Sequence, residues 1–381
     1  MPWTQLSGIG EIDATEWDAL FDPAYPFTRH AFLAALEDSG SVAPETGWEP
    51  AHIVVRDDAG TPIAAAPHYR KHHSYGEFVF DFEWARAAQR IGHDYYPKGL
   101  CAIPFTPSAG PRLGARDPTA RAALGRALRA AAESEGLSSI HTLFALEADA
   151  NALREAGFLE RQDLQFRFAN RGYADFDDYL AALSSARRKK IRRERRRVHE
   201  EAGIGFETVP GDTLDHATWE RVYALYAHTY HLRGQPPYLT FDFWLRYGAV
   251  PGTPVRVVLA RHEGRIVACA LCVQGGDTLY GRHWGTEADY HSLHFETCYY
   301  QGIAYTIDQG LAAFDAGAQG GHKLLRGFEP VITRSMHWLS EPRLHDAVAR
   351  FLERERAAVS QGRDELAAHS AYRRTAPEPG R

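Results

Sequence analysis

Hydrophobic and polar positions along the chain predict two similar groups of helices and strands. Residues 54–66 and 258–270 each read as an apolar strand, a tight turn at Gly60 or Gly264, and a second apolar strand. The two glycines lie 204 residues apart (264 − 60 = 204). We expect a third strand after each hairpin, formed by FVFDF in the first half and LYGRHWG in the second.

Helical periodicity precedes and follows each group of strands. The expected helices cover 28–38, 117–136, 176–203, 216–232, 240–247 and 295–309, and a last strand closes each half at 163–169 and at 331–339. The repeat predicts an α/β (α+β) fold, with two tandem domains that each hold a mixed, mostly antiparallel sheet flanked by helices.

The length of 381 residues suits two domains better than one. The expected domains are 1–172 and 173–370, followed by a flexible tail over 371–381. No apolar run is long enough to span a bilayer, and the N-terminal stretch lacks the basic start and apolar run of a signal peptide. We therefore expect a cytoplasmic protein without stable membrane insertion. Its four cysteines are too few for a disulfide scaffold, and its oligomeric state stays open.

Charge is concentrated in one predicted helix. The chain has a net charge of −6, but RRKKIRRERRR (187–197) holds nine cations and one glutamate, so it carries +8 and the remainder −14. Only a thin apolar stripe on the helix can face a core. One interpretation is a solvated helix paired with the acidic body, and the other is contact with phosphates, which arginine binds in a bidentate manner. The nine cations are Arg187, Arg188, Lys189, Lys190, Arg192, Arg193, Arg195, Arg196 and Arg197.

A second group of candidates surrounds the last predicted strand of the second meander. Helical periodicity places Glu296, Tyr299 and Tyr300 on one face, which suits orientation and deprotonation of an amine. His294 lies about 200° from Glu296 around such a helix. The alternative is a structural role, with a buried glutamate bonded to tyrosine hydroxyls. The strand itself ends in Arg282, His283 and Trp284.

A third candidate is the glycine-rich segment GAQGGHKLLRGFEP (317–330). His322, Lys323 and Arg326 could bind a phosphate or carboxylate there, although the spacing is not that of a P-loop. The alternative is a surface turn. We expect Arg112, in the similar stretch TPSAGPRL, to be structural.

Other motifs do not support a site. Cys269 and Cys272 form a C-x-x-C, but the strand pattern places them on opposite faces, which favours a core role. The histidine pairs 228/231 and 291/294 lack carboxylate or cysteine partners, so no metal is expected.

The strings LYGRHWG, LHFETCYYQGI, GAQGGHKLLRGFEPVITRSMHW and SEPRLHDAVARFLERE resemble bacterial peptidoglycan biosynthesis/recognition proteins, relatives of the Fem aminoacyltransferases in the GNAT superfamily. GYADFDDYLAALSSARRKKIRRERR and TPSAGPRL fit the same family, so the resemblance covers nearly the whole chain. It implies two GNAT-type domains and, by analogy with Fem relatives, transfer of an amino acid from charged tRNA to an amine. The R/Q-x-x-G-x-G/A loop of acetyl-CoA users is absent, which disfavours CoA.

The sequence thus predicts an aminoacyl-tRNA-dependent transferase that forms an amide bond with an amine acceptor and needs no cofactor beyond its co-substrate. Glu296 would act on the amine with Tyr299, Tyr300 or His294. The residues expected to bind substrate or stabilise the oxyanion are Arg282, His283, Trp284, His322, Lys323 and Arg326. The alternatives are a CoA-dependent N-acyltransferase with an atypical loop, or a non-catalytic module that binds a peptidoglycan-type or anionic ligand.

Overall fold

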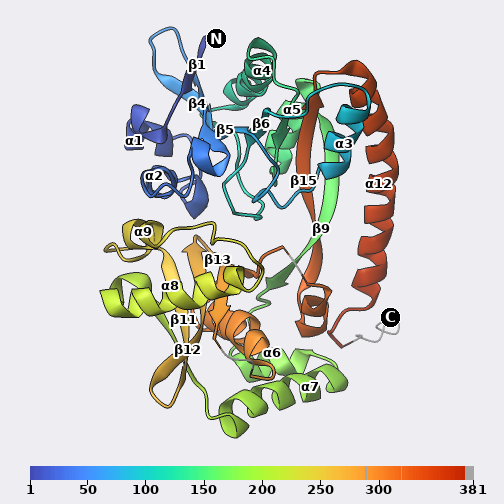
Figure 1. The fold of residues 1–381 in the computed structure, drawn as a ribbon. Helices are drawn as coiled ribbons and strands as arrows, with labels where there is room; N and C mark the ends of the chain where they lie inside the picture. Colours follow the sequence, from blue (N-terminus) through green and yellow to red (C-terminus); the bar gives the residue numbers. More distant parts are fainter. Residues whose placement is uncertain (288–289, 319, 374–381) are drawn as a thin grey trace. The chain divides into compact units, whose positions relative to one another are not determined.

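The computed structural model describes residues 1–287, 290–318 and 320–373 (Figure 1). The chain forms two compact units that are interleaved in sequence. Strands β9 (Leu159–Ala169) and β15 (Glu329–Leu339) each pass from one unit to the other. Unit 1 holds residues 1–164, 238–247 and 332–361, and unit 2 holds 165–237, 248–331 and the chain from 362 onward. The boundary near 172 stays a prediction about which segments fold independently.

Unit 1 contains two groups of strands. One sheet has the order β1-β3-β4-β7, and the second group has the order β15-β8-β6-β5-β2, in which β6 and β8 are parallel. The strands are β1 (Trp3–Leu6), β2 (Trp48–Pro50), β3 (His52–Arg56), β4 (Pro62–Ala66), β5 (His68–Lys71), β6 (Lys98–Cys101), β7 (Gly114–Ala115) and β8 (Ser139–Thr142).

Helices pack against the strands of unit 1. The longest one wholly inside the unit begins where Asp117 accepts a hydrogen bond from the Ala120 N–H, and its alanines and leucines pack on β3 and β4. The helices are α1 (Ala14–Asp18), α2 (His30–Asp38), α3 (Phe82–Arg90), α4 (Pro118–Ser134), α5 (Glu147–Glu155), α9 (Phe241–Phe243) and α12 (Pro342–Ala368), which extends into unit 2. Three single 3-10 turns cover Ile9–Glu11 (η1), Pro26–Thr28 (η2) and Pro44–Thr46 (η3).

The prediction of a strand at FVFDF (78–82) is wrong. The first meander therefore lacks the third strand that the second one has. Phe78 has a φ of 63°, which a strand does not tolerate. Asp81 is buried and accepts hydrogen bonds from Lys98 and from the Tyr95 hydroxyl. This buried charge pair holds the segment as a loop, and α3 begins at Phe82.

Unit 2 is built on one sheet with the order β10-β11-β12-β13-β14-β9, in which only β13 and β14 are parallel. The second predicted meander is therefore confirmed. The strands are β10 (Gly205–Pro210), β11 (Val255–His262), β12 (Arg265–Gly275), β13 (Thr278–Thr286) and β14 (Ala313–Asp315). The helices are α6 (Phe176–Ala182), α7 (Ser185–Arg196), α8 (His216–His231), α10 (Leu293–Phe295) and α11 (Gln301–Asp308). The π turns are η4 (Arg197–Glu201), η6 (Trp244–Gly248, mostly in unit 1) and η7 (Glu296–Tyr300), and the 3-10 turns are η5 (Gly211–Thr213) and η8 (Gly321–Arg326).

The helix expected over 176–203 is broken at Leu183, whose backbone is extended. Ser184 N–H donates to the Ala371 carbonyl, and Leu183 forms a bridge with Tyr372, so the end of the described chain stabilises the break. Residues 371–373 of the predicted tail thus make defined contacts, and 374–381 lie outside the described residues. The predicted apolar stripe is buried and consists of Leu180, Leu183, Ile191 and Val198.

None of the helices in the described ranges has the length and apolar character that a bilayer span requires. The predicted mixed α/β class is confirmed by these sheets and helices, and the structural relatives reported below share the fold.

Candidate functional site

Strands β13 and β14 pair over only three positions, Thr278 to Tyr280 opposite Ala313 to Asp315. Beyond Tyr280, β13 continues to Thr286 along β12. The β12 register skips Arg282, which is the extra residue of a bulge between Gly281 and His283. A bulge changes the direction of the side chains that follow it, and bulges are frequent beside active sites. The predicted group Arg282, His283 and Trp284 therefore lies where the sheet opens.

Five rings gather beside this end of β13, and we call them the aromatic cluster: Trp284, His294, Phe295, Tyr299 and His322. The His294 ring centroid lies 4.9 Å from that of Trp284 and 5.3 Å from that of Tyr299. The Tyr299 hydroxyl and His322 Nε2 are 2.9 Å apart. The structure thus brings together residues that the sequence placed in two separate groups.

The pKa of each histidine in the aromatic cluster lies below its ordinary value. Burial, together with the neighbouring His322, Arg326 and Lys323, lowers the pKa of His294 to about 4. Burial also lowers the pKa of His322. His294 stays partly exposed, so its ring can reach a bound molecule.

Lys323 lies directly behind the aromatic cluster. Its ammonium donates a hydrogen bond to the Gly317 carbonyl and lies 6.0 Å from the Tyr299 ring centroid. Burial lowers the pKa of Lys323 to about 8, while Asp315 opposes the shift. The Lys323 side chain is fully buried. Its charge can stabilise an anion at the cluster, which is the role that the sequence suggested.

Glu296 lies on the other side of its helix and faces α7. Glu296 Oε1 accepts a hydrogen bond from Gln301 Nε2 (2.8 Å) and lies 3.3 Å from Arg195 Nη2. His199 Nε2 is 3.0 Å from the same oxygen, without hydrogen-bond geometry. Glu296 has no exposed surface, and its Oε2 has no hydrogen-bond partner among the described residues.

The expected face of Glu296, Tyr299 and Tyr300 does not form. Residues 296–300 make a π turn, in which Gln301 N–H bonds to the Glu296 carbonyl five residues earlier. This spacing places Gln301, rather than a tyrosine, beside the Glu296 carboxylate. Tyr299 instead reaches His322, and Tyr300 reaches a second buried carboxylate on α7.

That second carboxylate is Glu194, the single acid in the basic run. Glu194 Oε2 accepts hydrogen bonds from the Tyr300 hydroxyl and from Arg326 Nη2, the latter at 2.9 Å. Arg326 Nε donates to the Tyr300 hydroxyl (2.8 Å), and its Nη1 donates to the His322 carbonyl (3.0 Å). The Arg326 guanidinium also lies 3.7 Å from the Phe295 ring centroid. These contacts assign Arg326 and Tyr300 to holding the site together rather than to meeting a substrate.

The cations of α7 divide into two groups. Arg188 donates to carbonyls at the end of α6, Arg192 pairs with Asp177 at 3.2 Å, and Arg196 pairs with Glu201 at 3.6 Å. Lys190 lies 3.9 Å from Glu194. Arg197 Nη1 lies 3.4 Å from His291 Nε2. Within the described residues, the cations of this run that have neither an ion pair nor a side-chain hydrogen bond are Arg187, Lys189 and Arg193.

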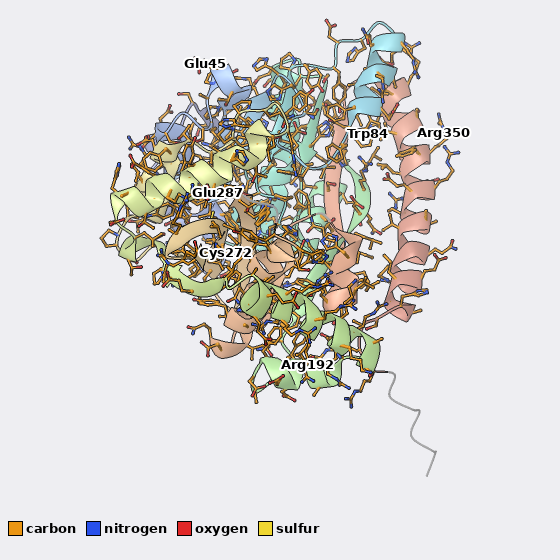
Figure 2. The ribbon with its side chains drawn as sticks, turned by 60° about the horizontal axis from the view of Figure 1, so that its bottom comes forward. Glu45, Trp84, Arg192, Cys272, Glu287 and Arg350 are labelled. Carbon is orange, nitrogen blue, oxygen red and sulfur yellow. The ribbon has the colours of Figure 1, made fainter. Side chains whose placement is uncertain are left out.

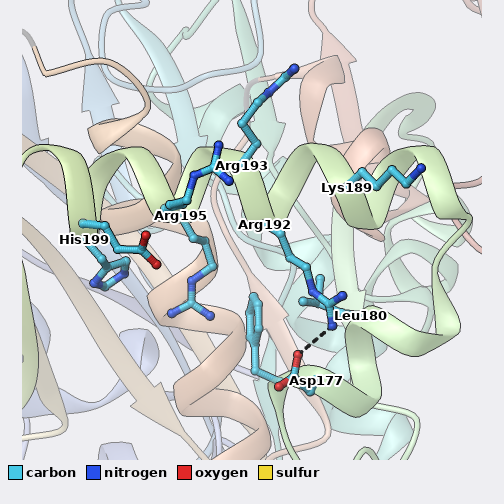
Figure 3. A pocket seen from close by; sticks show the side chains of 10 residues that line it. Asp177, Leu180, Lys189, Arg192, Arg193, Arg195 and His199 are labelled. Carbon is cyan, nitrogen blue, oxygen red and sulfur yellow. Dashed lines mark hydrogen bonds and ion pairs between the residues drawn. The ribbon is translucent and has the colours of Figure 1, made fainter.

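A cavity of about 650 Å³ opens between α6 and α7. In Figure 3, Arg192 reaches across it to Asp177, while Arg193 extends from the opposite side of the helix. Figure 2 shows Arg192 among the side chains of these helices. The lining residues are Phe176, Asp177, Leu180, Lys189, Arg192, Arg193, Arg195, Arg196, His199 and Glu200. A concave surface with this many cations suits a phosphate-rich ligand.

Three residues of the site were not predicted from the sequence: Glu194, His199 and Phe295. Glu194 could have been found, because it follows Ile191 by three residues and precedes Val198 by four, so helical periodicity places it on the buried face. His199 and Phe295 carried no comparable signal, because each depends on a π turn or on a contact distant in sequence.

Two smaller predictions are confirmed. Cys269 Sγ donates to the Val222 carbonyl of α8, whereas Cys272 belongs to a separate core cluster, as expected for the opposite face of β12. Arg112 is fully buried and donates to the Ser108 carbonyl, as expected for a structural residue. Across the described ranges, no three His, Cys, Asp or Glu side chains form a group that could hold a metal.

A protein-family profile matches residues 8–374, and its description is FemAB-like peptidoglycan biosynthesis/recognition. The chain belongs to this family. Among solved structures, FemX is similar over 92% of this chain and 100% of its own, with a TM-score of 0.54 and 13% identity.

Two further structures share the fold of this FemAB-like protein. The C-terminal domain of a putative lysylphosphatidylglycerol synthetase from Agrobacterium fabrum covers 91% of this chain and 97% of its own, with a TM-score of 0.52 and 10% identity. L-PGS from Bacillus licheniformis covers 87% and 98%, with a TM-score of 0.50 and 11% identity. No curated protein sequence matches the chain.

Proposed function

We propose that this FemAB-like protein transfers an aminoacyl group from charged tRNA to an amine acceptor. The observation that carries the proposal is the basic helix α7, which presents Arg187, Lys189 and Arg193 without ion-pair partners in the described structure and lines a 650 Å³ cavity. Like charges four residues apart destabilise a helix, so a ligand that neutralises them offsets a cost that folding alone does not require.

The proposed reaction uses the aromatic cluster. The acceptor nitrogen attacks the ester carbonyl carbon, the C–N bond forms, and the bond to the ribose oxygen breaks. The proton lost by the nitrogen passes to His294, and the departing ribose oxygen takes up a proton. Lys323 supplies positive charge near the carbonyl oxygen. We assign the base to His294 rather than to Glu296, because Glu296 is fully buried and held by Arg195.

The segment after β13 supports RNA over CoA as donor. Acetyl-CoA users place a glycine-rich loop there to receive pyrophosphate. Here Glu287 occupies that place and pairs with Arg221 at 2.6 Å. The Glu287 side chain has only acceptor atoms and is held by arginine, so it offers a pyrophosphate group no hydrogen-bond donor at this position.

Binding of tRNA tests the proposal, with R187Q/K189Q/R193Q as the variant. We expect the wild-type chain to bind tRNA with an affinity that falls steeply with salt, and the variant to lose about tenfold or more in affinity and to show a shallower slope. The control R126Q/R350Q/R354Q removes the same charge from exposed positions of α4 and α12. Equal losses in both variants, or no tRNA binding by the wild type, would contradict the proposed donor.

A further inference from the structure

Two buried carboxylates join α7 to the segment that carries the aromatic cluster. One belongs to α7 and the other to η7, so each element contributes a carboxylate that reaches the other. Glu194 extends from α7 to Arg326 and Tyr300, and Glu296 extends from η7 back to Arg195 and His199. We propose that Glu194 is a positioning residue that holds the η8 turn through Arg326, so that a polyanion on α7 and the aromatic cluster are coupled. The coupling to a polyanion rests on the proposed function, whereas the positioning role does not.

Glu194 is buried within a basic segment whose cations are exposed or half-buried. Its side chain is 7% exposed, although the neighbouring Arg193 and Arg196 are exposed. An acid that only moderated repulsion between these cations would lie on the surface with them. A buried carboxylate costs free energy unless charged or hydrogen-bonding groups compensate, and here Arg326 and the Tyr300 hydroxyl do so.

Arg326 connects this carboxylate to the site. The same guanidinium that meets Glu194 donates to the His322 carbonyl, and the His322 ring in turn meets Tyr299. Lys323 is the next residue, and its N–H bonds to the Gly320 carbonyl. The preceding segment contains Gly317, Gly320 and Gly321, which have no side chains to anchor it. The Arg326 side chain therefore anchors His322 to α7, beside two other anchors of η8: the Tyr179 hydroxyl, which donates to the Arg326 carbonyl (2.8 Å), and the buried Leu324.

Coupling follows from this geometry. A ligand that orders α7 also orders Arg326 and Tyr300, because both are bonded to Glu194. Coupling between two sites is reciprocal in free energy. A polyanion that fixes α7 should therefore steady His322 and Lys323. Loss of the Glu194 charge should release η8 while the exposed cations that bind the polyanion stay in place.

Hydrogen–deuterium exchange of residues 320–328 tests the inference in the variant Glu194→Gln, with deacylated tRNA as the probe. Glu201→Gln is the matched control, because it removes a carboxylate that pairs with Arg196 on the surface, where both side chains are 57% exposed. We expect E194Q to exchange at least about fivefold faster than wild type over 320–328 without tRNA. It should bind tRNA within about twofold of wild type, because its exposed cations are unchanged. Wild type and E201Q should gain protection there when tRNA binds, and E194Q should not.

The titration of His322, followed by NMR, is a second readout that a purely structural role would not move. Burial lowers the pKa of His322, so release of η8 should raise it toward about 6.5 in E194Q. Tyr300→Phe keeps the Glu194–Arg326 pair and should show a smaller effect. It replaces E194Q as the test variant if E194Q does not fold. Unchanged exchange in both variants would overturn the positioning role. Released exchange in E194Q together with no tRNA binding by wild type would overturn the coupling and the proposed donor while leaving the positioning role.

Discussion

Single residues in unit 2 separate into those that face a possible substrate and those that hold others in place. His294 is partly exposed and neutral, and it lies among four other rings. Tyr300 and Arg326 form hydrogen bonds with Glu194 and with each other. The distinction matters because residue type alone predicted a direct role in catalysis or substrate binding for all three residues.

The variant His294→Gln tests the assignment of the base. We expect transfer to fall by about 100-fold or more, because general-base catalysis contributes on that order. The fold should persist, since the ring is only partly buried. Because burial lowers the pKa of His294 to about 4, its ring stays unprotonated as pH falls from 8 to 5, and its own titration should reduce the rate only near pH 4. Rates measured from pH 4 to 8 check both points, and near wild-type transfer by the variant would remove His294 as the base.

At the scale of elements, periodicity predicted part of what the structure contains, and it did not identify the 27-residue helix α12 or the shorter helices α3 and α5. The second meander, α4, α8 and the buried stripe of α7 follow from local pattern. Two expected elements were wrong for the same reason, which is contact between residues far apart in sequence. The Lys98–Asp81 pair prevents a strand near Phe80, and residues 371–372 break the helix at Leu183.

The same physics limited the prediction of the site. A regular helix was assumed over 295–309, but the π turn η7 shifts the side chains, so Glu296 and Tyr300 each meet α7 at a different point. Sequence pattern does not report such a turn, because it depends on contacts formed across the fold. The region of the site could be predicted from the sequence. Which of its residues face a substrate and which hold other residues in place could not.

A truncation tests how the break between α6 and α7 is maintained. A chain that ends after Ser370 loses the Ser184–Ala371 and Arg373–Ala182 backbone hydrogen bonds and the buried Ala371. We expect a loss of about 1–3 kcal/mol in the free energy of unfolding, as for a few backbone hydrogen bonds. A chain that ends after Arg373 retains these contacts and is the control. Equal stability of both truncations in denaturant unfolding would contradict the stabilising role.

For the whole molecule, family membership and fold agree with the predicted class, while the reaction is our proposal. The chain belongs to the FemAB-like family over residues 8–374 and shares its fold with FemX. Its net charge of −6 would oppose binding to RNA in general, so the +8 segment on α7 confines any such contact to one surface. The proposal therefore requires that a charged tRNA bound to this surface places its aminoacyl ester at the aromatic cluster.

Amide formation from charged tRNA is the measurement that tests this account most directly. The wild-type chain and His294→Gln are incubated with a pool of aminoacyl-tRNAs and candidate amines, and the products are identified by mass spectrometry. We expect an aminoacylated amine from the wild-type chain that is absent without charged tRNA and strongly reduced with the variant. Product formation from acyl-CoA instead, or the same yield with free amino acids in place of charged tRNA, would contradict it.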